Sequence, residues 1–205
     1  MREGRPLTPD QTRDALDDAL ERARAGDEAG FVVVYRALHP RILRYAASLV
    51  GADADDVAAE VWFQVTRDLS SFRGDADGFR AWVTTITRHR ALDHHRARVR
   101  RPVVLDDVLA LADRPAGDDT AESAVERLAT ARALALVASL PREQAEAVVL
   151  RAVVGLDVAS AAAVLGKRPG AVRVAAHRGL KRLAAELARR QAAERDDGPR
   201  PDGAE

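Results

Sequence analysis

Hydrophobic positions recur at threes and fours along almost every long segment of the chain, and no alternating β-branched run is bounded by hairpin turns. This pattern predicts an all-α protein. All eight aromatic residues lie between positions 31 and 82, whereas residues 121–190 are built mainly from Leu, Val and Ala. Because the two regions have different apolar side chains, we predict two small helical domains.

The segment between these domains has the composition of an exposed, flexible linker. It contains Pro102, Pro115, Gly117 and five aspartates, and its end, at 119–122, is typical of a capping box that restarts a helix. About 25 extended residues span up to ~80 Å, so the two domains need not touch. We predict an N-terminal extension at 1–25, a first domain at 26–101, an acidic linker at 102–124, a second domain at 125–190 and a disordered tail at 191–205.

Short helices and glycine turns in the second domain predict a helix-turn-helix. Pro141 opens the first helix and Gly155 ends it, with a predicted buried side of Ala145, Val148, Val149, Ala152 and Val153. A second helix covers about 158–165, and a turn at 166–170 leads into a third helix that runs to about 190. This order of elements places a recognition helix in the major groove of DNA.

The third helix separates into two faces on a helical wheel. We predict that its buried stripe is Val172, Ala176, Leu180, Leu183 and Leu187. The opposite face and the turn before it form the predicted DNA-binding surface, which consists of Lys167, Arg168, Ala171, Arg173, Val174, His177, Arg178 and Lys181. The long basic side chains can contact guanine acceptors or phosphates, and the small apolar ones can lie against thymine methyl groups. A basic amphipathic helix alone is more often a solvated surface, but the turn and short helix before it favour DNA binding.

The first domain carries a second candidate surface for DNA. A polar loop at 70–78 contains two glycines, and the helix that follows, from about 79 to 98, is predicted to bury Phe79, Trp82, Val83 and Ile86. The predicted DNA-binding residues are Phe72 and Arg73 in the loop and Arg80, Thr84, Arg88, His95 and Arg98 along the far side of the helix. A basic stripe beside a loop that can hold an unstacked base is typical of proteins that bind single-stranded or melting DNA.

The helix around 53–69 combines a hydrophobic side with an acidic one. Val57, Val61 and Val65 recur at fours and face a core, whereas Asp55, Asp56 and Glu60 lie elsewhere on the surface. Together with an exposed Trp62 or Phe63, this acidic stripe would suit a protein partner. Acidic residues also stabilise helix N-termini, so both interpretations stay open.

Charge changes sign along the chain although the formal net charge is zero. Residues 67–101 carry +5 and residues 142–190 carry +6, and the stretch 102–141 between them carries −4. Two basic segments separated by an acidic one favour salt-sensitive nucleic-acid binding, with two solvated helical faces as the alternative.

Several classes of chemistry are excluded or disfavoured. The chain has no cysteine, which excludes disulfides and thiol nucleophiles, and it has no P-loop, GxGxxG or GxSxG motif. His89 and Asp93, with His94 or His95, could ligate a metal, but no second cluster completes a catalytic site, so we predict no metal and no cofactor. No stretch of about 18 uncharged apolar residues is present, which predicts a soluble cytoplasmic protein without membrane insertion.

The motifs, taken in order, resemble the extracytoplasmic-function (group IV) sigma factors of bacterial RNA polymerase, within the sigma-70 family. The resemblance covers about 26–101 and 125–188. It rests on Ala25-Gly26-Asp27-Glu28, the helix 54–62, the segments 79–86 and 91–94, Leu140-Pro141, Gly155-Leu156, Leu165-Gly166 and the segment 170–173.

The resemblance implies a transcription initiation factor that binds core RNA polymerase, recognises promoter DNA, helps to open it and catalyses nothing itself. The helix with Asp55, Asp56, Glu60 and Trp62 or Phe63 would bind the clamp of the largest subunit, and the flap of the second subunit is a further expected contact. The 70–78 loop and the basic helix after it would recognise the −10 element. The second domain would recognise the −35 element, and the acidic linker would thread the polymerase. Such factors are often held inactive by an anti-sigma partner.

The chain departs from the family pattern at several positions. Ala59 stands where a glutamine is usual, Thr66 replaces an aromatic residue, His89 replaces an asparagine, Ser160 replaces an acidic residue, and Val174-Ala175 replaces a Ser-Arg pair. With fewer polar side chains on the recognition helix, we predict −35 recognition through phosphates and methyl groups. Two alternatives remain: a helix-turn-helix regulator that binds a palindromic operator without polymerase, and a metal-dependent hydrolase.

Overall fold

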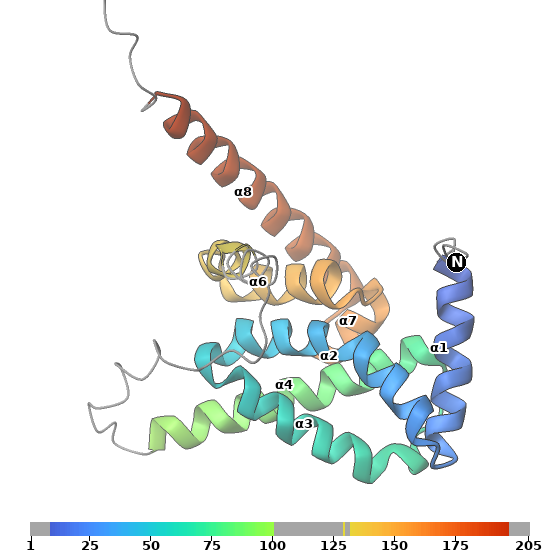
Figure 1. Ribbon diagram of the computed structural model, residues 1–205. Helices are drawn as coiled ribbons and strands as arrows, with labels where there is room; N and C mark the ends of the chain where they lie inside the picture. Colours follow the sequence, from blue (N-terminus) through green and yellow to red (C-terminus); the bar gives the residue numbers. More distant parts are fainter. Residues whose placement is uncertain (1–8, 101–128, 130–131, 197–205) are drawn as a thin grey trace, which may run out of the picture.

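The computed structural model describes residues 9–100, 129 and 132–196, and within these ranges the chain is helical without a strand. The first domain contains α1 (Pro9–Arg24), α2 (Glu28–Val50), α3 (Ala54–Asp68) and α4 (Ala76–Arg100), with short 3₁₀ turns η1 (Gly51–Asp53) and η2 (Leu69–Ser71) on either side of α3. The second contains α6 (Arg142–Val148), the π-helical turn η5 (Val149–Val154), α7 (Val158–Leu165) and α8 (Pro169–Asp196) (Figure 1). The predicted acidic linker and its capping box lie outside the described residues, as do residues 197–205 of the predicted tail. α8 continues past the predicted start of that tail at 191.

The first domain is a bundle around one apolar core, and α1 belongs to it. Leu20 of α1 packs with Val34 and Ile42 of α2 and with buried residues of α3 and α4. α2 begins at its N-cap Asp27, whose carboxylate accepts hydrogen bonds from the amides of the first turn. Gly30 lets α1 and α2 cross closely, because a Cβ there would lie 2.8 Å from the Ala19 carbonyl oxygen. The predicted buried positions are confirmed in full for α3, at Val57, Val61 and Val65, and in α4 for Phe79, Val83 and Ile86, whereas Trp82 is half-buried.

The second domain forms the predicted helix-turn-helix, with glycines at both turns. Gly155 and Gly166 have φ values of 82° and 64°, and each ends a helix in the left-handed conformation. Asp157 caps α7, because its side chain accepts a hydrogen bond from the Ser160 amide at 2.7 Å. The buried side of the first helix differs from prediction. Ala152 is exposed, whereas Leu150 and Val154 are buried, because the π-helical turn η5 changes the spacing that an α-helical wheel assumes.

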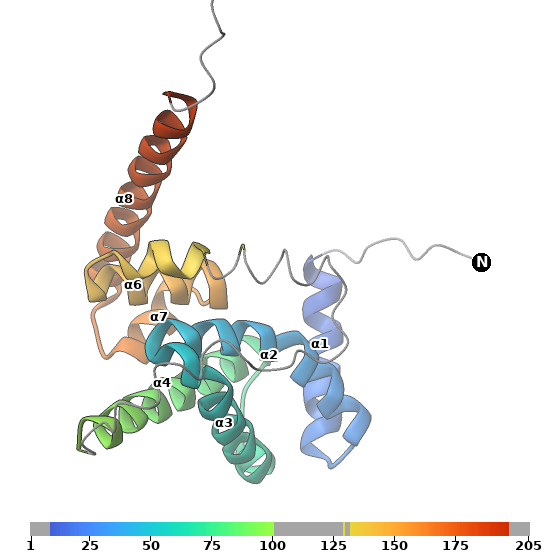
Figure 2. The same cartoon turned by 60° about the vertical axis from the view of Figure 1, so that its left-hand side comes forward.

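One side of helix α8 is buried, and only over the first half of the helix. Val172 and Ala176 are buried as predicted and Leu183 is half-buried, but Leu180 and Leu187 are 49% and 45% exposed, so their predicted burial is wrong. α8 crosses α6 closely at Gly179, where a Cβ would lie 2.6 Å from Val148 Cγ2. Beyond this crossing, α8 extends away from the rest of the molecule in both views (Figures 1 and 2). The sequence pattern marks an apolar stripe, but no neighbouring helix among the residues that the structure describes follows it that far.

The two domains pack against each other. α2 contacts η5, and α4 contacts α7. Tyr45 of α2 is fully buried within the second domain's apolar core, where its side chain packs with residues such as Leu150 and Val154. Although the linker is long enough to separate the domains, this structure holds them in contact, with the first domain's α2 and α4 facing the helix-turn-helix (Figure 2).

Candidate DNA-binding and polymerase-binding surfaces

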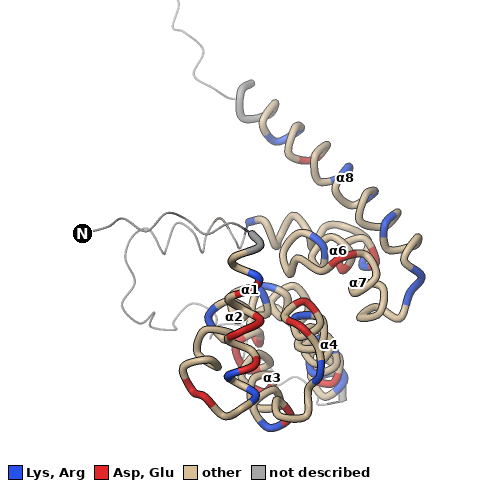
Figure 3. The backbone as a smooth tube through the Cα atoms, turned by 90° about the vertical axis from the view of Figure 1, so that its right-hand side faces the viewer, with Lys and Arg blue, Asp and Glu red and all other residues tan. Residues whose placement is uncertain are grey.

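The predicted recognition face of α8 is open to solvent. The side chains of all the predicted residues from Lys167 to Lys181 are exposed, including Val174 at 48%. Lys167 forms an ion pair with Glu143 of α6, which ties the turn before α8 to the start of the domain. Lys and Arg positions recur along α8 with few acidic residues among them (Figure 3). The helix therefore presents a basic surface without rearrangement, and this surface has the chemistry of major-groove and phosphate contacts.

The predicted −10 loop is held by an aromatic residue at one end. Phe72 is half-buried, and its ring lies 5.2 Å from the ring centroids of both Phe79 and Trp82. Gly74 has a φ of 144°, and a Cβ there would lie 3.0 Å from Phe72 Cζ, so glycine accommodates the chain beside the ring. Arg73 is exposed, and its guanidinium donates to the carbonyl oxygens of Ser70 and Phe72 at 2.8 Å each. The loop thus presents a short exposed segment on a fixed apolar base.

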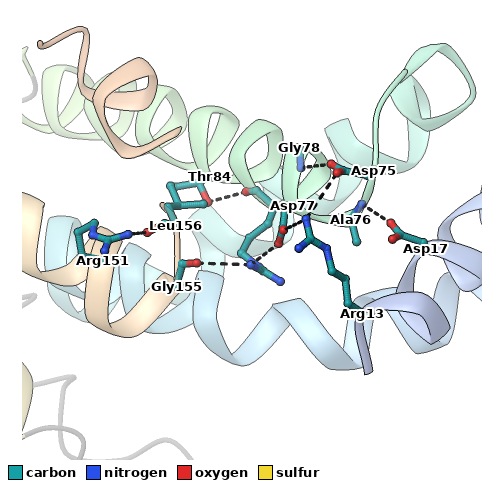
Figure 4. A network of polar contacts seen from close by, with 11 residues as sticks. Arg13, Asp17, Asp75, Ala76, Asp77, Gly78, Thr84, Arg151, Gly155 and Leu156 are labelled. Atoms are coloured by element: carbon teal, nitrogen blue, oxygen red, sulfur yellow. Dashed lines mark hydrogen bonds and ion pairs between the residues drawn. The ribbon is translucent and has the colours of Figure 1, made fainter. Parts of the chain in front are cut away.

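The predicted stripe on α4 is covered over half of its length. Thr84 is fully buried, and its hydroxyl donates to the Arg80 carbonyl at 2.7 Å, so its predicted exposure is wrong. Arg80 Nη1 donates to Asp77 at 2.9 Å and to the Gly155 carbonyl of the second domain at 3.4 Å (Figure 4). Arg80 therefore reaches the turn after η5, and Thr84, one turn along α4, is buried, which the wheel of a single helix could not reveal.

Arg88 is covered by the second domain as well. Its guanidinium lies 3.8 Å from a carboxylate oxygen of Glu146 on α6, and the two side chains are only 21% and 10% exposed. The Nε atoms of Arg80 and Arg88 are buried and make no hydrogen bond. The contact between the domains therefore neutralises the charge of Arg88 without satisfying every donor of these two arginines, and a buried unsatisfied donor is costly.

Arg41 of α2 adds to this covered basic face and was missed by the sequence analysis. Burial lowers the pKa of Arg41, and the neighbouring charges of Arg80 and Arg44 lower it further. Its guanidinium also lies near Gly155, where an added Cβ would meet Arg41 Nη1 at 3.5 Å. In the sequence, Arg41 and Arg44 are recognisable only as a pair of basic residues three positions apart. The fold brings Arg41 beside Arg80 of α4.

The far end of the α4 stripe has a different environment. His95 is exposed, and Arg98 is exposed but forms an ion pair with Asp53. His94 Nε2 lies 3.0 Å from the same carboxylate. Burial raises the pKa of Asp53, but hydrogen bonds from His94 and Arg98 outweigh it and leave the pKa below its usual value. Among the residues that the structure describes, no three His, Asp or Glu side chains are grouped so that they could hold a metal ion.

Of the two candidate aromatic residues on α3, Trp62 and Phe63, only Phe63 is exposed beside the acidic face. Asp55, Asp56 and Glu60 are exposed, and Phe63 is 73% exposed. Trp62 is only 6% exposed, and its Nε1–H donates to His39 Nδ1 at 3.1 Å. The predicted interface role of Trp62 is therefore not supported, and Phe63 is the aromatic side chain beside the acidic stripe.

Comparison with known proteins identifies both domains. A family model described as Sigma-70 region 2 matches residues 34–101, and one described as Sigma-70, region 4 matches residues 130–183. The ECF RNA polymerase sigma factor SigD of Mycobacterium tuberculosis (strain ATCC 25618 / H37Rv) is 34% identical over 190 residues, covering 88% of this chain and 89% of the relative. The ECF RNA polymerase sigma factor ShbA of Streptomyces griseus is 36% identical over 177 residues, covering 81% and 92%. The solved structure of CnrH in complex with the cytosolic domain of CnrY matches with a TM-score of 0.59 at 26% identity, covering 85% of this chain and 98% of that chain.

The helical pair of domains, one of them a helix-turn-helix, defines a DNA-binding transcription factor. The chain belongs to the extracytoplasmic-function sigma factors of bacterial RNA polymerase. Sigma factors bind core polymerase and direct promoter recognition and opening, so the alternative of a regulator that acts without polymerase is not retained. In the part of the chain that the structure describes, no helix is long and apolar enough to span a bilayer.

Proposed function

We propose that the second domain binds the −35 element through the exposed face of α8. The single observation that carries this proposal is that every residue predicted from the wheel is exposed on this face. Arg173, Arg178 and Lys181 contact phosphates or guanine acceptors, and Ala171 and Val174 lie against thymine methyl groups. Lys167, Arg168 and His177 contact the flanking backbone. Because Val174 and Ala175 carry no polar group, base discrimination there comes from apolar contact.

In the same proposal, the first domain binds core polymerase and the −10 element. Asp55, Asp56, Glu60 and Phe63 form the surface on α3 that docks on the clamp of the largest subunit, where an exposed aromatic side chain beside charged groups is typical of interface anchors. The exposed segment of the 70–78 loop, with Arg73, holds an unstacked base of the −10 element. Arg80, Arg88, His95 and Arg98 then neutralise phosphates of the adjoining DNA, whereas Thr84 acts inside the helix and not on DNA.

DNA binding through Arg80 and Arg88 requires the domains to separate first. In the arrangement described here, Glu146 occupies the position of an anion beside Arg88, and the Gly155 carbonyl accepts from Arg80. A DNA phosphate and the second domain cannot both occupy this face. We propose that docking on core polymerase supplies the free energy of separation, because the two domains are then held by different parts of the enzyme.

The test is promoter selection with reconstituted holoenzyme. Purified chain and core polymerase are given a randomised promoter library, and run-off products identify the −10 and −35 sequences that are used. We expect transcription that depends on core polymerase, a −35 preference that relaxes in Arg178→Ala, and a −10 preference that relaxes in Arg73→Ala. A strong guanine preference in the −35 element that disappears in Val174→Ser would contradict the proposed recognition by methyl contacts.

We also propose an anti-sigma partner, a cytoplasmic location and no catalytic activity of the chain itself. The CnrH structure was solved in complex with the cytosolic domain of CnrY, and another solved structure of the same fold is a complex of the sigma factor RpoE with the anti-sigma factor NepR. Sigma factors are regulatory subunits and not catalysts. Co-purification with a tagged chain from its own cells, followed by competition with core polymerase, tests for such a partner.

A further inference from the structure

Helix α1 lies outside the matched Sigma-70 region 2, which begins at residue 34, yet it contacts the start of α4 directly. The Asp17 carboxylate accepts a hydrogen bond from the Ala76 backbone amide at 2.6 Å. Arg13 forms an ion pair with Asp77 and lies 3.7 Å from Asp75 (Figure 4). The acidic N-terminal helix therefore meets the end of the 70–78 loop at two points.

The contact with Asp17 satisfies a group that the local chain leaves free. Ala76 is the first residue of α4, so its amide has no partner within the helix. The local cap, Asp75, accepts instead from the Gly78 amide at 2.8 Å. Ala76 is only 2% exposed, so water cannot readily replace Asp17. A carboxylate at a helix N-terminus is further stabilised by the helix dipole. Asp17 thus caps α4 from another helix.

The contact with Arg13 continues into the proposed DNA-binding face. Asp77 accepts from Arg80 Nη1 at 2.9 Å while it pairs with Arg13, so the three side chains form one chain of charges. In this way α1 fixes the far end of the exposed segment 73–75, whose near end is fixed by the packing of Phe72 against Phe79 and Trp82. Removing either anchor leaves that segment attached at one end.

We infer that Asp17 and Arg13 are positioning residues for promoter recognition, which hold the 70–78 loop in the conformation that binds the −10 element without contacting DNA themselves. This inference rests on the proposed role of the loop. Its physical basis is pre-organisation: a loop that is already fixed loses less conformational entropy when it captures an unstacked base. The N-terminal helix is then part of the unit that recognises the promoter.

The test uses holoenzyme assembled from core polymerase and four forms of the full chain: wild type, Asp17→Ala, Asp17→Asn and Asp18→Ala. The Asn variant keeps an acceptor oxygen for the Ala76 amide, and Asp18 is an exposed aspartate one position along the same helix. Each form is titrated against a fork-junction DNA with a single-stranded −10 element, the same DNA with a scrambled −10 sequence, and a duplex that carries only the −35 element. Amide hydrogen exchange of residues 72–78 is measured in parallel.

We expect Asp17→Ala to weaken binding to the −10 fork junction by about tenfold and to speed amide exchange in the loop, because a buried donor loses its acceptor. Asp17→Asn and Asp18→Ala should stay within about threefold of wild type, and binding to the −35 duplex and to core polymerase should not change. Unchanged binding of Asp17→Ala to the −10 fork junction, or equal losses on the −10 fork junction, the −35 duplex and core polymerase, would overturn the inference. An Asn variant as weak as the Ala variant would also overturn it. If wild type itself does not distinguish the −10 sequence from the scrambled one, the proposed role of the loop fails, and the inference fails with it.

Discussion

The two basic helices α4 and α8 have similar sequence patterns and opposite environments. Both carry positive residues at helical spacing opposite an apolar stripe, yet the face of α8 from Lys167 to Lys181 is exposed. On α4, by contrast, Arg80 and Arg88 contact the other domain, and Thr84 between them is buried. A helical wheel shows which side of a helix is polar, but not which neighbour covers that side. In this chain the neighbour is the second domain itself, so one proposed DNA-binding surface is exposed and the other is covered until the domains separate.

The largest expected effect is on promoter opening in Arg88→Glu. The change removes the proposed phosphate contact and places two carboxylates together, because Glu146 lies 3.8 Å from the Arg88 guanidinium. We expect open-complex formation on a promoter to fall about a hundredfold, measured by permanganate reactivity with saturating core polymerase. The charge-swapped double variant Arg88→Glu/Glu146→Arg should restore the contact between domains but not promoter opening. Normal opening in the double variant would show that Arg88 acts only within the closed arrangement.

Arg178→Glu tests the open surface in the same way. The side chain is exposed, so the variant should fold normally and leave the domain contact intact. We expect affinity for a −35 duplex to fall about thirtyfold, since a favourable phosphate or base contact becomes a repulsion. Fluorescence anisotropy with holoenzyme gives the affinity, and Arg190→Glu, the same change of charge at an exposed residue of the same helix beyond the proposed face, is the control. Equal losses in both variants would indicate non-specific attraction to DNA.

Gly179→Ala tests the crossing of α6 and α8 that orients the open surface. A Cβ at Gly179 would lie 2.6 Å from Val148 Cγ2, whereas nothing lies within 4 Å of a Cβ at Gly170. We expect Gly179→Ala to lower the free energy of unfolding by about 1–2 kcal/mol through overpacking, and Gly170→Ala to raise it by about 0.5 kcal/mol. Urea denaturation followed by circular dichroism measures both. A stabilised Gly179→Ala variant would mean that the helices separate easily at this point.

The smallest expected effect is in Glu146→Gln, which weakens the contact between α6 and α4 and leaves the proposed DNA-binding residues themselves unchanged. The neutral amide no longer attracts Arg88, although it can still accept a hydrogen bond. We expect the free chain, without polymerase, to bind single-stranded −10 DNA about threefold more tightly, and small-angle scattering to show a larger mean size. If neither quantity changes, Glu146 does not hold the domains together, and apolar packing around Tyr45 is sufficient.

The fold was largely predictable because it depends on local signals. The glycines at 155 and 166, the apolar periodicity of α3 and the polar face of α8 each act through the residue's own helix or turn, and all are confirmed. Most of the predictions that are wrong depend on neighbours distant in sequence, whereas the one for Ala152 depends on an irregular turn that contains this residue. Ala152 is exposed because of a π-helical turn, Leu180 because α8 leaves α6, and Thr84 is buried because another domain lies against it. The preference for Phe63 over Trp62 required His39, which is 23 residues away and supplies the acceptor that lets an indole be buried.

The same reasoning explains why the sequence indicates no function for α1. Its acidic residues look like ordinary solvated positions, and only the fold brings Asp17 to the Ala76 amide, 59 positions along the chain. A single sequence contains no signal for such a contact. By contrast, the sequence alone defines the proposed recognition face of α8, because all its members lie on one helix and its preceding turn.

Tyr45 gives the molecule an intrinsic optical probe. Its phenol is fully buried by the second domain, its oxygen has no hydrogen-bond partner, and burial, together with the charge of Glu146, raises the pKa of this group far above the ordinary value. The chain has two tyrosines, and Tyr35 is the other. When the domains part, water reaches the Tyr45 ring and its ionisation returns toward that of a free phenol. An alkaline titration followed by ultraviolet absorbance, with Tyr35→Phe to isolate the signal, therefore reports the separation of the two halves without an added dye.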